Sequence, residues 1–166
     1  MRYFIDMDGT LAVYPIEIEN WWEIEGIFKI LTPQEKVIKA IKRLVANGQE
    51  VYILSAYNIK TPSAKDGKNY WLDQYLPEID ETHRIFTLFG QKKTDYVPGG
   101  VRPTDVLLDD YNENLEAWAL AGGTGIKLLN GINSRKTWDG VSVRANGTIK
   151  ELVRVLEEVH NDLDID

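Results

Sequence analysis

Short apolar runs and longer amphipathic segments alternate along the whole chain. Five apolar runs stand out, at residues 3–5, 51–54, 85–88, 106–108 and 126–129. Runs of this length without alternating polar positions are typical of parallel strands buried on both faces. The segments between them repeat apolar residues at helical spacing. Strands that alternate with helices predict an α/β fold, a doubly wound domain with a Rossmann-like parallel sheet.

The ends of two helices can be placed from their capping residues. Thr32-Pro33-Gln34-Glu35 has the pattern of a capping box with proline at the first helical position, which predicts a helix that begins at Pro33. Asn47-Gly48 is typical of the end of that helix, and Thr148 is expected to cap the last one. We expect a single domain over residues 1–166, in which residues 11–32 form a short flap after the first strand.

Polar side chains follow the predicted strands at the points where the strands end. The first strand is followed by Asp6 and Asp8, the second by Ser55-Ala56, the fourth by Asp109-Asp110, and the loop after the third leads to Lys92-Lys93. In open parallel sheets the ligand site lies beyond the carboxyl ends of the strands, so we expect these groups to converge. Two carboxylate pairs would repel each other unless a cation or a proton lies between them. Ligation by oxygen alone suits Mg²⁺.

The composition narrows the class of protein further. The chain has 19 basic and 26 acidic residues, a net charge of −7, which argues against a nucleic-acid partner. It contains no cysteine, which excludes a disulfide framework, a thiolate metal site and a cysteine nucleophile. No stretch approaches the roughly 20 apolar residues of a membrane span, and the N-terminus lacks the apolar core of a signal peptide. We therefore expect a cytoplasmic protein with no membrane partner.

The strand-end residues resemble the four motifs of the haloacid dehalogenase superfamily. The specific element is Asp6-Met7-Asp8-Gly9-Thr10-Leu11-Ala12; Ser55, the lysine pair and Leu107–Asp110 match the other three in order. The resemblance implies a phosphatase in which Asp6 attacks phosphorus and forms an aspartyl-phosphate. It implies that Asp8 protonates the leaving oxygen and then deprotonates water, which favours hydrolysis over storage of the phosphoryl group. Gly9 is expected to allow a sharp turn beside the nucleophile.

The same resemblance implies a role for the second and third motifs. Ser55 and the backbone amide of Ala56 would hold phosphoryl oxygens, and a lysine would neutralise the transferring group. Lys93 is favoured over Lys92 because the motif lysine immediately precedes a short helix, which here begins at Thr94.

A Mg²⁺ ion is also implied by the resemblance. Its ligands would be Asp6, the backbone carbonyl of Asp8, and Asp110 directly, with Asp109 acting through a water molecule. The ion would shield these carboxylates from an incoming phosphate.

Three downstream stretches narrow the resemblance to the 5′(3′)-deoxyribonucleotidase group, cytosolic C type. They are Trp71–Pro77, Asp109–Leu115 and Gly125–Asn133, the last followed by Trp138. The resemblance implies a small phosphomonoester substrate, a nucleoside monophosphate. The chain departs from the better characterised members in its cap, which is much shorter here.

The flap leaves several alternatives open. It contains Trp21-Trp22, and Trp22 either stacks on a nucleobase or packs against the core. Thr10 either contacts the substrate or forms a hydrogen bond within its own turn. Other hypotheses are a phosphatase for a sugar phosphate or a nucleic-acid 3′ end, and a binding protein without turnover. A homo-oligomer whose second subunit completes the cap also stays open.

Overall fold

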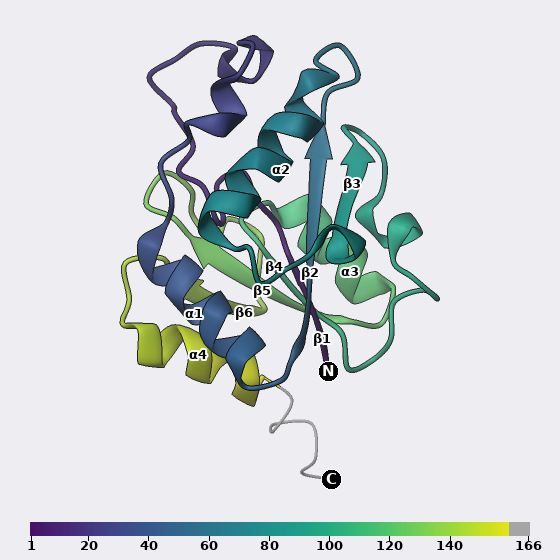
Figure 1. Ribbon diagram of the computed structural model, residues 1–166. Helices are drawn as coiled ribbons and strands as arrows, with labels where there is room; N and C mark the ends of the chain where they lie inside the picture. The colour runs from purple at the N-terminus through teal and green to yellow at the C-terminus, as the bar shows by residue number, and fades with distance from the viewer. Residues whose placement is uncertain (160–166) are drawn as a thin grey trace, which may run out of the picture.

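The computed structural model describes residues 1–159 and contains a six-stranded parallel sheet of order β3-β2-β1-β4-β5-β6, with helices on both faces (Figure 1). The strands are β1 (Arg2–Ile5), β2 (Glu50–Tyr57), β3 (Arg84–Leu88), β4 (Val106–Asp109), β5 (Thr124–Leu129) and β6 (Val141–Arg144). The predicted α/β class is confirmed. Residues 160–166 of the predicted domain lie outside the described residues.

Residues 1–159 also contain four α-helices and four 3₁₀ helices. The α-helices are α1 (Glu35–Ala46), α2 (Ser63–Tyr75), α3 (Asn112–Leu120) and α4 (Ile149–Glu158). The 3₁₀ helices are η1 (Trp21–Glu23), η2 (Ile27–Lys29), η3 (Glu81–His83) and η4 (Lys93–Tyr96). Thr148 caps α4 as predicted, because its hydroxyl accepts from the amide of Glu151.

The two faces of the sheet bury different side chains, since successive residues of a strand point to opposite sides. Tyr3 and Ile5 of β1 belong to the apolar core that contains side chains of α1, α2 and α4. Phe4, between them, belongs to a second core with Leu115 and Trp118 of α3. Continuous apolar runs were therefore a correct signal of strands covered on both sides.

The predicted capping box at Thr32 is wrong. The α1 helix begins at Glu35, and no side chain caps it. Instead, the backbone around Pro33 pairs with the start of the flap: the amide of Val13 donates to the carbonyl of Thr32 at 2.7 Å, and the amide of Gln34 donates to the carbonyl of Leu11 at 2.7 Å. These two bonds hold the ends of residues 11–32 together, and the helix starts only after them.

The arrangement of the strands places the site. β1 lies between β2 and β4, so the chain continues from β1 to one side and later returns to the other. Such a reversal leaves a crevice at the carboxyl end of the two central strands. The flap lies at this end, beside the upper part of α2, in Figure 1. Among residues 1–159, no helix is both long enough and apolar enough to cross a membrane.

Candidate active site

Lys93 joins two of the predicted carboxylates at the carboxyl edge of the sheet. Its Nζ donates to Asp6 Oδ1 and to Asp109 Oδ2, each at 2.7 Å. Lys93 is the first residue of η4 and is buried, whereas Lys92 is exposed. Burial acts to lower the pKa of Lys93, but the charges of Asp109 and Asp6 outweigh it and raise the pKa above its usual value. Lys93 is therefore a permanent cation at this position.

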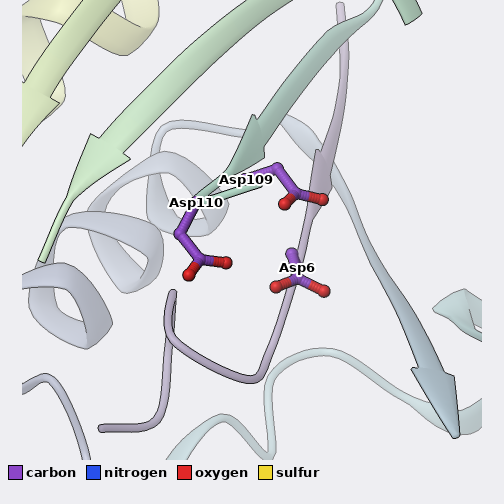
Figure 2. Close-up of side chains that lie close together, drawn as sticks. All are labelled: Asp6, Asp109 and Asp110. Atoms are coloured by element: carbon purple, nitrogen blue, oxygen red, sulfur yellow. The ribbon is translucent and has the colours of Figure 1, made fainter. Parts of the chain in front are cut away.

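Three carboxylates surround one small space at this edge. One oxygen from each of Asp6, Asp109 and Asp110 lies within 4.8 Å of the others, and Figure 2 shows their side chains gathered between the ends of β1 and β4. Both oxygens of Asp109 have partners: Tyr111 N donates to Oδ1 at 2.9 Å, and Asn114 Nδ2 to Oδ2 at 3.0 Å, beside Lys93.

The carboxylate of Asp110 accepts fewer hydrogen bonds than that of Asp109. Asn130 Nδ2 donates to its Oδ2 at 3.2 Å, and no side chain of the described residues donates to its Oδ1. Burial raises the pKa of Asp110 to about 8, and the neighbouring charges of Asp6 and Asp109 add to this effect. Burial also raises the pKa of Asp109, to about 6, against the opposing influence of Lys93. Lys93 therefore offsets only part of the cost of burying these two carboxylates.

Gly9 allows the first motif to pass close to this acidic group. Its φ of 81° lies in the left-handed region, which confirms the predicted sharp turn. A Cβ atom at this position would lie 2.4 Å from Asp110 Oδ2. The carbonyl of Gly9 accepts from Asn130 Nδ2 at 2.8 Å, so Asn130 bridges the loop after β1 and the loop after β4. Any side chain at residue 9 would displace the carboxylate of Asp110.

Lys68 was missed in the sequence, and it lies at the centre of a second polar cluster. Its Nζ donates to Asp8 Oδ2 at 2.5 Å, to Ser55 Oγ at 2.8 Å and to the carbonyl of Ala56 at 2.8 Å. The side chain is fully buried. A signal existed, because Lys68 follows Ala64 by four residues on the face of α2 that otherwise carries buried apolar groups.

Asp8 has one oxygen engaged and one free. Lys68 occupies Oδ2, whereas Oδ1 is buried and has no hydrogen-bond partner among the described residues. Burial raises the pKa of Asp8, and the charge of Lys68 opposes this shift. A buried carboxylate oxygen without a partner is costly unless a ligand or a water molecule completes it.

The four aspartates and Lys93 border a pocket of about 790 Å³. We call one set of its lining residues the floor, namely Asp6, Asp8, Ala56, Lys93, Asp109 and Asp110, and we call the flap residues that line it the wall, namely Tyr14, Trp21, Trp22 and Phe28. Trp21 is almost fully buried, and its ring contacts Trp22 edge-on at a centroid distance of 6.1 Å. Trp22 is half-buried and is thus the flap tryptophan more available to a ligand.

Thr10 and Ser55 lie behind the pocket and do not line it. Both are fully buried. Thr10 Oγ1 donates to Asp6 Oδ2 at 3.3 Å, so the hydroxyl contacts the nucleophile of the predicted mechanism. Ser55 Oγ accepts from Lys68, which leaves its own O–H free to donate to a ligand.

The fold and the site together define the class of protein. Paired aspartates after β1, an acidic pair after β4 and a lysine that joins them around a pocket are the arrangement of a phosphatase of the haloacid dehalogenase superfamily. Within that class, the chain belongs to the family described as 5′ nucleotidase, deoxy (pyrimidine), cytosolic type C, whose family model matches residues 4–153. The predicted resemblance is confirmed.

A solved structure supports the same fold. The chain superimposes on D,D-heptose 1,7-bisphosphate phosphatase from Burkholderia thailandensis with a TM-score of 0.61 and 12% sequence identity, over 93% of this chain and 97% of that one. At this identity the similarity establishes the fold alone. No match was found among curated proteins.

Proposed function

We propose that this phosphatase is a Mg²⁺-dependent hydrolase of nucleoside monophosphates, a 5′(3′)-deoxyribonucleotidase of the cytosol that works through an aspartyl-phosphate. The observation that carries the proposal is the pair Asp6 and Asp8 on the floor of the pocket. Asp6 is fixed by Lys93 and Thr10, and one oxygen of Asp8 has no partner within residues 1–159. A nucleophile held in place beside a free proton carrier is what two-step phosphoryl transfer requires.

In the first step, a carboxylate oxygen of Asp6 attacks phosphorus in line with the ester bond. The bond from phosphorus to the ester oxygen breaks, and Asp8 gives the proton on its Oδ1 to that leaving oxygen, which departs as an alcohol. Burial raises the pKa of Asp8, which is the direction of shift that a general acid needs. Lys93 lies against Asp6 and balances the charge of the transferred group.

In the second step, water attacks phosphorus of the aspartyl-phosphate. Asp8, now ionised, takes a proton from the water at Oδ1, and the bond from phosphorus to Asp6 breaks. Inorganic phosphate leaves, and both aspartates return to their starting states. The amide of Ala56, on the pocket floor, and the O–H of Ser55 would hold phosphoryl oxygens through both steps.

The residues present fit a divalent cation. Asp6, Asp8, Asp109 and Asp110 bring four carboxylates to this edge, and Lys68 and Lys93 bring only two ammonium groups. Burial is the main cause of the raised pKa values of Asp109 and Asp110, and the negative charge of the neighbouring carboxylates adds to it.

We assign Mg²⁺ to the carboxylates of Asp6 and Asp110 and the backbone carbonyl of Asp8. Asp109 would act through water, because both of its oxygens already have donors. When bound, the ion supplies positive charge that lets a phosphate dianion approach these carboxylates.

The flap supports a nucleotide as the substrate. Its aromatic side chains line the wall above the acidic floor, and Trp22 retains exposed surface. Stacking of one base on an aromatic side chain contributes about 1–3 kcal/mol. We therefore assign the nucleobase to the side of Trp22. The family description names deoxy and pyrimidine nucleotides, which agrees with a flat base at this wall.

The test is phosphate release from a panel of deoxy- and ribonucleoside monophosphates, sugar phosphates and a generic aryl phosphate. It is run with Mg²⁺, with chelator, and with Asp6→Asn; Asp139→Asn, an exposed carboxylate away from the pocket, is the matched control. We expect metal-dependent release that Asp6→Asn abolishes and Asp139→Asn leaves intact. We also expect Trp22→Ala to lower kcat/KM for nucleotides about 5–100-fold more than for the aryl phosphate. A preference for sugar phosphates, or no release from a folded protein, contradicts the proposal.

A further inference from the structure

Lys68 forms a second cationic centre that the motifs of the superfamily do not account for. It lies on α2, between β2 and β3 in the chain, and it is fully buried. It is not among the residues that line the pocket, but it contacts Asp8 and Ala56, which are. Its three acceptors are Asp8, Ser55 and the carbonyl of Ala56.

These three contacts hold the groups that would act on the leaving oxygen and on the phosphoryl oxygens of the substrate. Asp8 is the proton carrier for the leaving oxygen. Ser55 and Ala56, which were expected to follow the second strand, lie within β2, near its carboxyl end, and would hold the phosphoryl oxygens. A free carboxylate can rotate and exchange its two oxygens. With Lys68 on Oδ2 at 2.5 Å, Asp8 presents only Oδ1, the atom left without a partner.

We propose that Lys68 is a positioning residue that holds Asp8 in one rotamer, so that Oδ1 delivers the proton to the leaving group. This inference rests on the proposed function, because it assigns a role within the same reaction. The two buried lysines have different roles in the proposed reaction. Lys93 contacts Asp6 and Asp109 and acts on the phosphoryl group, whereas Lys68 contacts Asp8 and acts on the departure of the alcohol.

The flap covers Lys68 and strengthens its contact with Asp8. Phe28 of η2 places its ring 4.9 Å from Lys68 Nζ, within the range of a cation–π interaction. The close approach of η2 to α2 requires Gly67, because a Cβ atom there would lie 3.0 Å from Phe28 Cβ. Exclusion of water by Phe28 lowers the local dielectric constant, and the attraction between Lys68 and Asp8 grows accordingly.

If Lys68 positions Asp8, the activity lost on removing Lys68 should depend on the leaving group of the ester. If Lys68 only supports the fold, the loss should not depend on it. An alkyl ester needs its leaving oxygen protonated as the bond breaks, whereas a nitrophenyl ester departs as a stable anion and needs little help. Loss of Lys68 should therefore slow alkyl esters selectively. A general loss of fold or of phosphate binding would slow both kinds of ester to the same extent.

The experiment measures kcat/KM for a series of phosphomonoesters without a base, from nitrophenyl through phenyl to alkyl phosphates. The enzymes are wild type, Lys68→Met and Lys93→Met, the last a matched substitution of the other buried lysine. The ratio kcat/KM reports the steps up to the first irreversible one, which includes departure of the alcohol. For Lys68→Met we expect a loss of about 10²–10³-fold with alkyl phosphates and less than about 10-fold with nitrophenyl phosphate.

Lys93→Met should instead lower kcat/KM across the series by a similar factor, since the phosphoryl group is common to all esters. An equal loss across the series for Lys68→Met would overturn the proposed role of Lys68. Failure of wild type to hydrolyse any ester would overturn the proposed function itself, so the two failures are distinguishable. If Lys68→Met does not fold, Lys68→Gln, which keeps a donor but lacks the charge, is measured in its place.

Chemical rescue provides a second readout. Because the chain has no cysteine, Lys68→Cys introduces a single thiol. Alkylation of the unfolded variant with bromoethylamine produces a side chain of nearly the length and charge of lysine. After refolding, alkyl phosphates should regain most of their lost kcat/KM, and alkylation with a neutral reagent should not restore it. Equal recovery with both reagents would show that Lys68 only fills space.

Discussion

Two buried charge clusters lie at opposite ends of the same two strands, and they are built differently. At the amino ends of β1 and β4, Arg2 and Asp105 form a bidentate pair, with Nε to Oδ1 at 2.9 Å and Nη2 to Oδ2 at 2.5 Å. Arg2 also donates to the carbonyls of Pro98 and Gly100, and Asp105 accepts from the amide of Arg102. One positive charge meets one negative charge, and the polar atoms named here all have partners.

The cluster at the carboxyl ends is not balanced. Four carboxylates share two ammonium groups, Asp8 Oδ1 has no partner among residues 1–159, and the pKa of Asp110 is raised to about 8. Burial of charges without full compensation lowers stability, so a cluster of this kind persists where a ligand completes it. In the structural pair, the charges are equal and the polar atoms have hydrogen-bond partners. In the site, carboxylates outnumber ammonium groups and a buried carboxylate oxygen has no partner within residues 1–159.

The largest expected effect is the loss of activity when Asp6 of the carboxyl-end cluster is replaced. Asp6→Asn removes the nucleophile, and kcat should fall by at least about 10⁴-fold in the phosphate-release assay. Because the substitution also removes one of the excess negative charges, thermal unfolding without metal should occur at the same temperature or higher. A large drop in Tm for Asp6→Asn would show that the carboxyl edge is a structural cluster like the other.

At the amino ends of β1 and β4, we expect a substitution to lower stability and to leave activity unchanged. Asp105→Asn leaves the buried guanidinium of Arg2 without its counter-charge, and the free energy of unfolding should fall by about 3–5 kcal/mol. The specific activity of the fraction that remains folded should stay near that of wild type. Urea unfolding measures the first quantity, and assays well below the midpoint measure the second. Selective loss of kcat in folded Asp105→Asn would contradict the separation of the two clusters.

Metal binding should remove part of the imbalance at the carboxyl edge. Mg²⁺ at about 100 times its Kd should stabilise the native state by about 2.7 kcal/mol. At about 2–4 °C per kcal/mol, this raises Tm by roughly 5–11 °C. Asp110→Asn should lose most of this rise, whereas Asp139→Asn should keep it. An equal rise in Asp110→Asn would place the ion elsewhere.

The pH dependence without metal follows from the raised pKa of Asp110. Its folded value, about 8, lies above the usual value of about 4 for an unfolded aspartate, so the native state binds the extra proton between these limits. The stability it contributes is complete below pH 4 and is lost as the pH rises through 8. The Tm of metal-free wild type should therefore fall over this range by more than that of Asp110→Asn. The same slope in both proteins would assign it to other groups.

The sequence predicted strands β1 to β5 and the motif carboxylates because both follow local rules. A short apolar run such as Val106–Leu108 is typical of a buried strand, and in a parallel sheet the residues at the carboxyl end of each strand lie at the ligand edge. The start of α1 was not predictable in this way. Its apparent capping box is used in backbone pairing between Pro33 and the flap, and that pairing depends on the return of a distant segment.

Lys68 and β6 could not be predicted for related physical reasons. The reach of Lys68 to Asp8 depends on how α2 is rotated against the sheet, and the close packing of η2 on Gly67 is part of what sets that rotation. Strand β6 is only four residues long, and in Val141–Arg144 apolar and polar residues alternate, so it has no continuous apolar run. Its pairing with β5 stabilises a segment that the local pattern leaves ambiguous.

The smallest expected effect is on kcat and comes from a single hydrogen bond to the nucleophile. Thr10 Oγ1 donates to Asp6 Oδ2 at 3.3 Å, the oxygen that Lys93 does not occupy. Thr10→Val keeps the shape of the side chain and removes this donor, which should lower kcat by about 2–10-fold, since such a bond is worth roughly 0.5–1.5 kcal/mol. Thr10→Ser should stay close to wild type. If Thr10 instead contacted the substrate, KM for the phosphate ester would change in Thr10→Val while kcat stayed the same. Steady-state kinetics with one aryl phosphate separate these cases, because orientation of the nucleophile affects the chemical step and not the affinity for the ester.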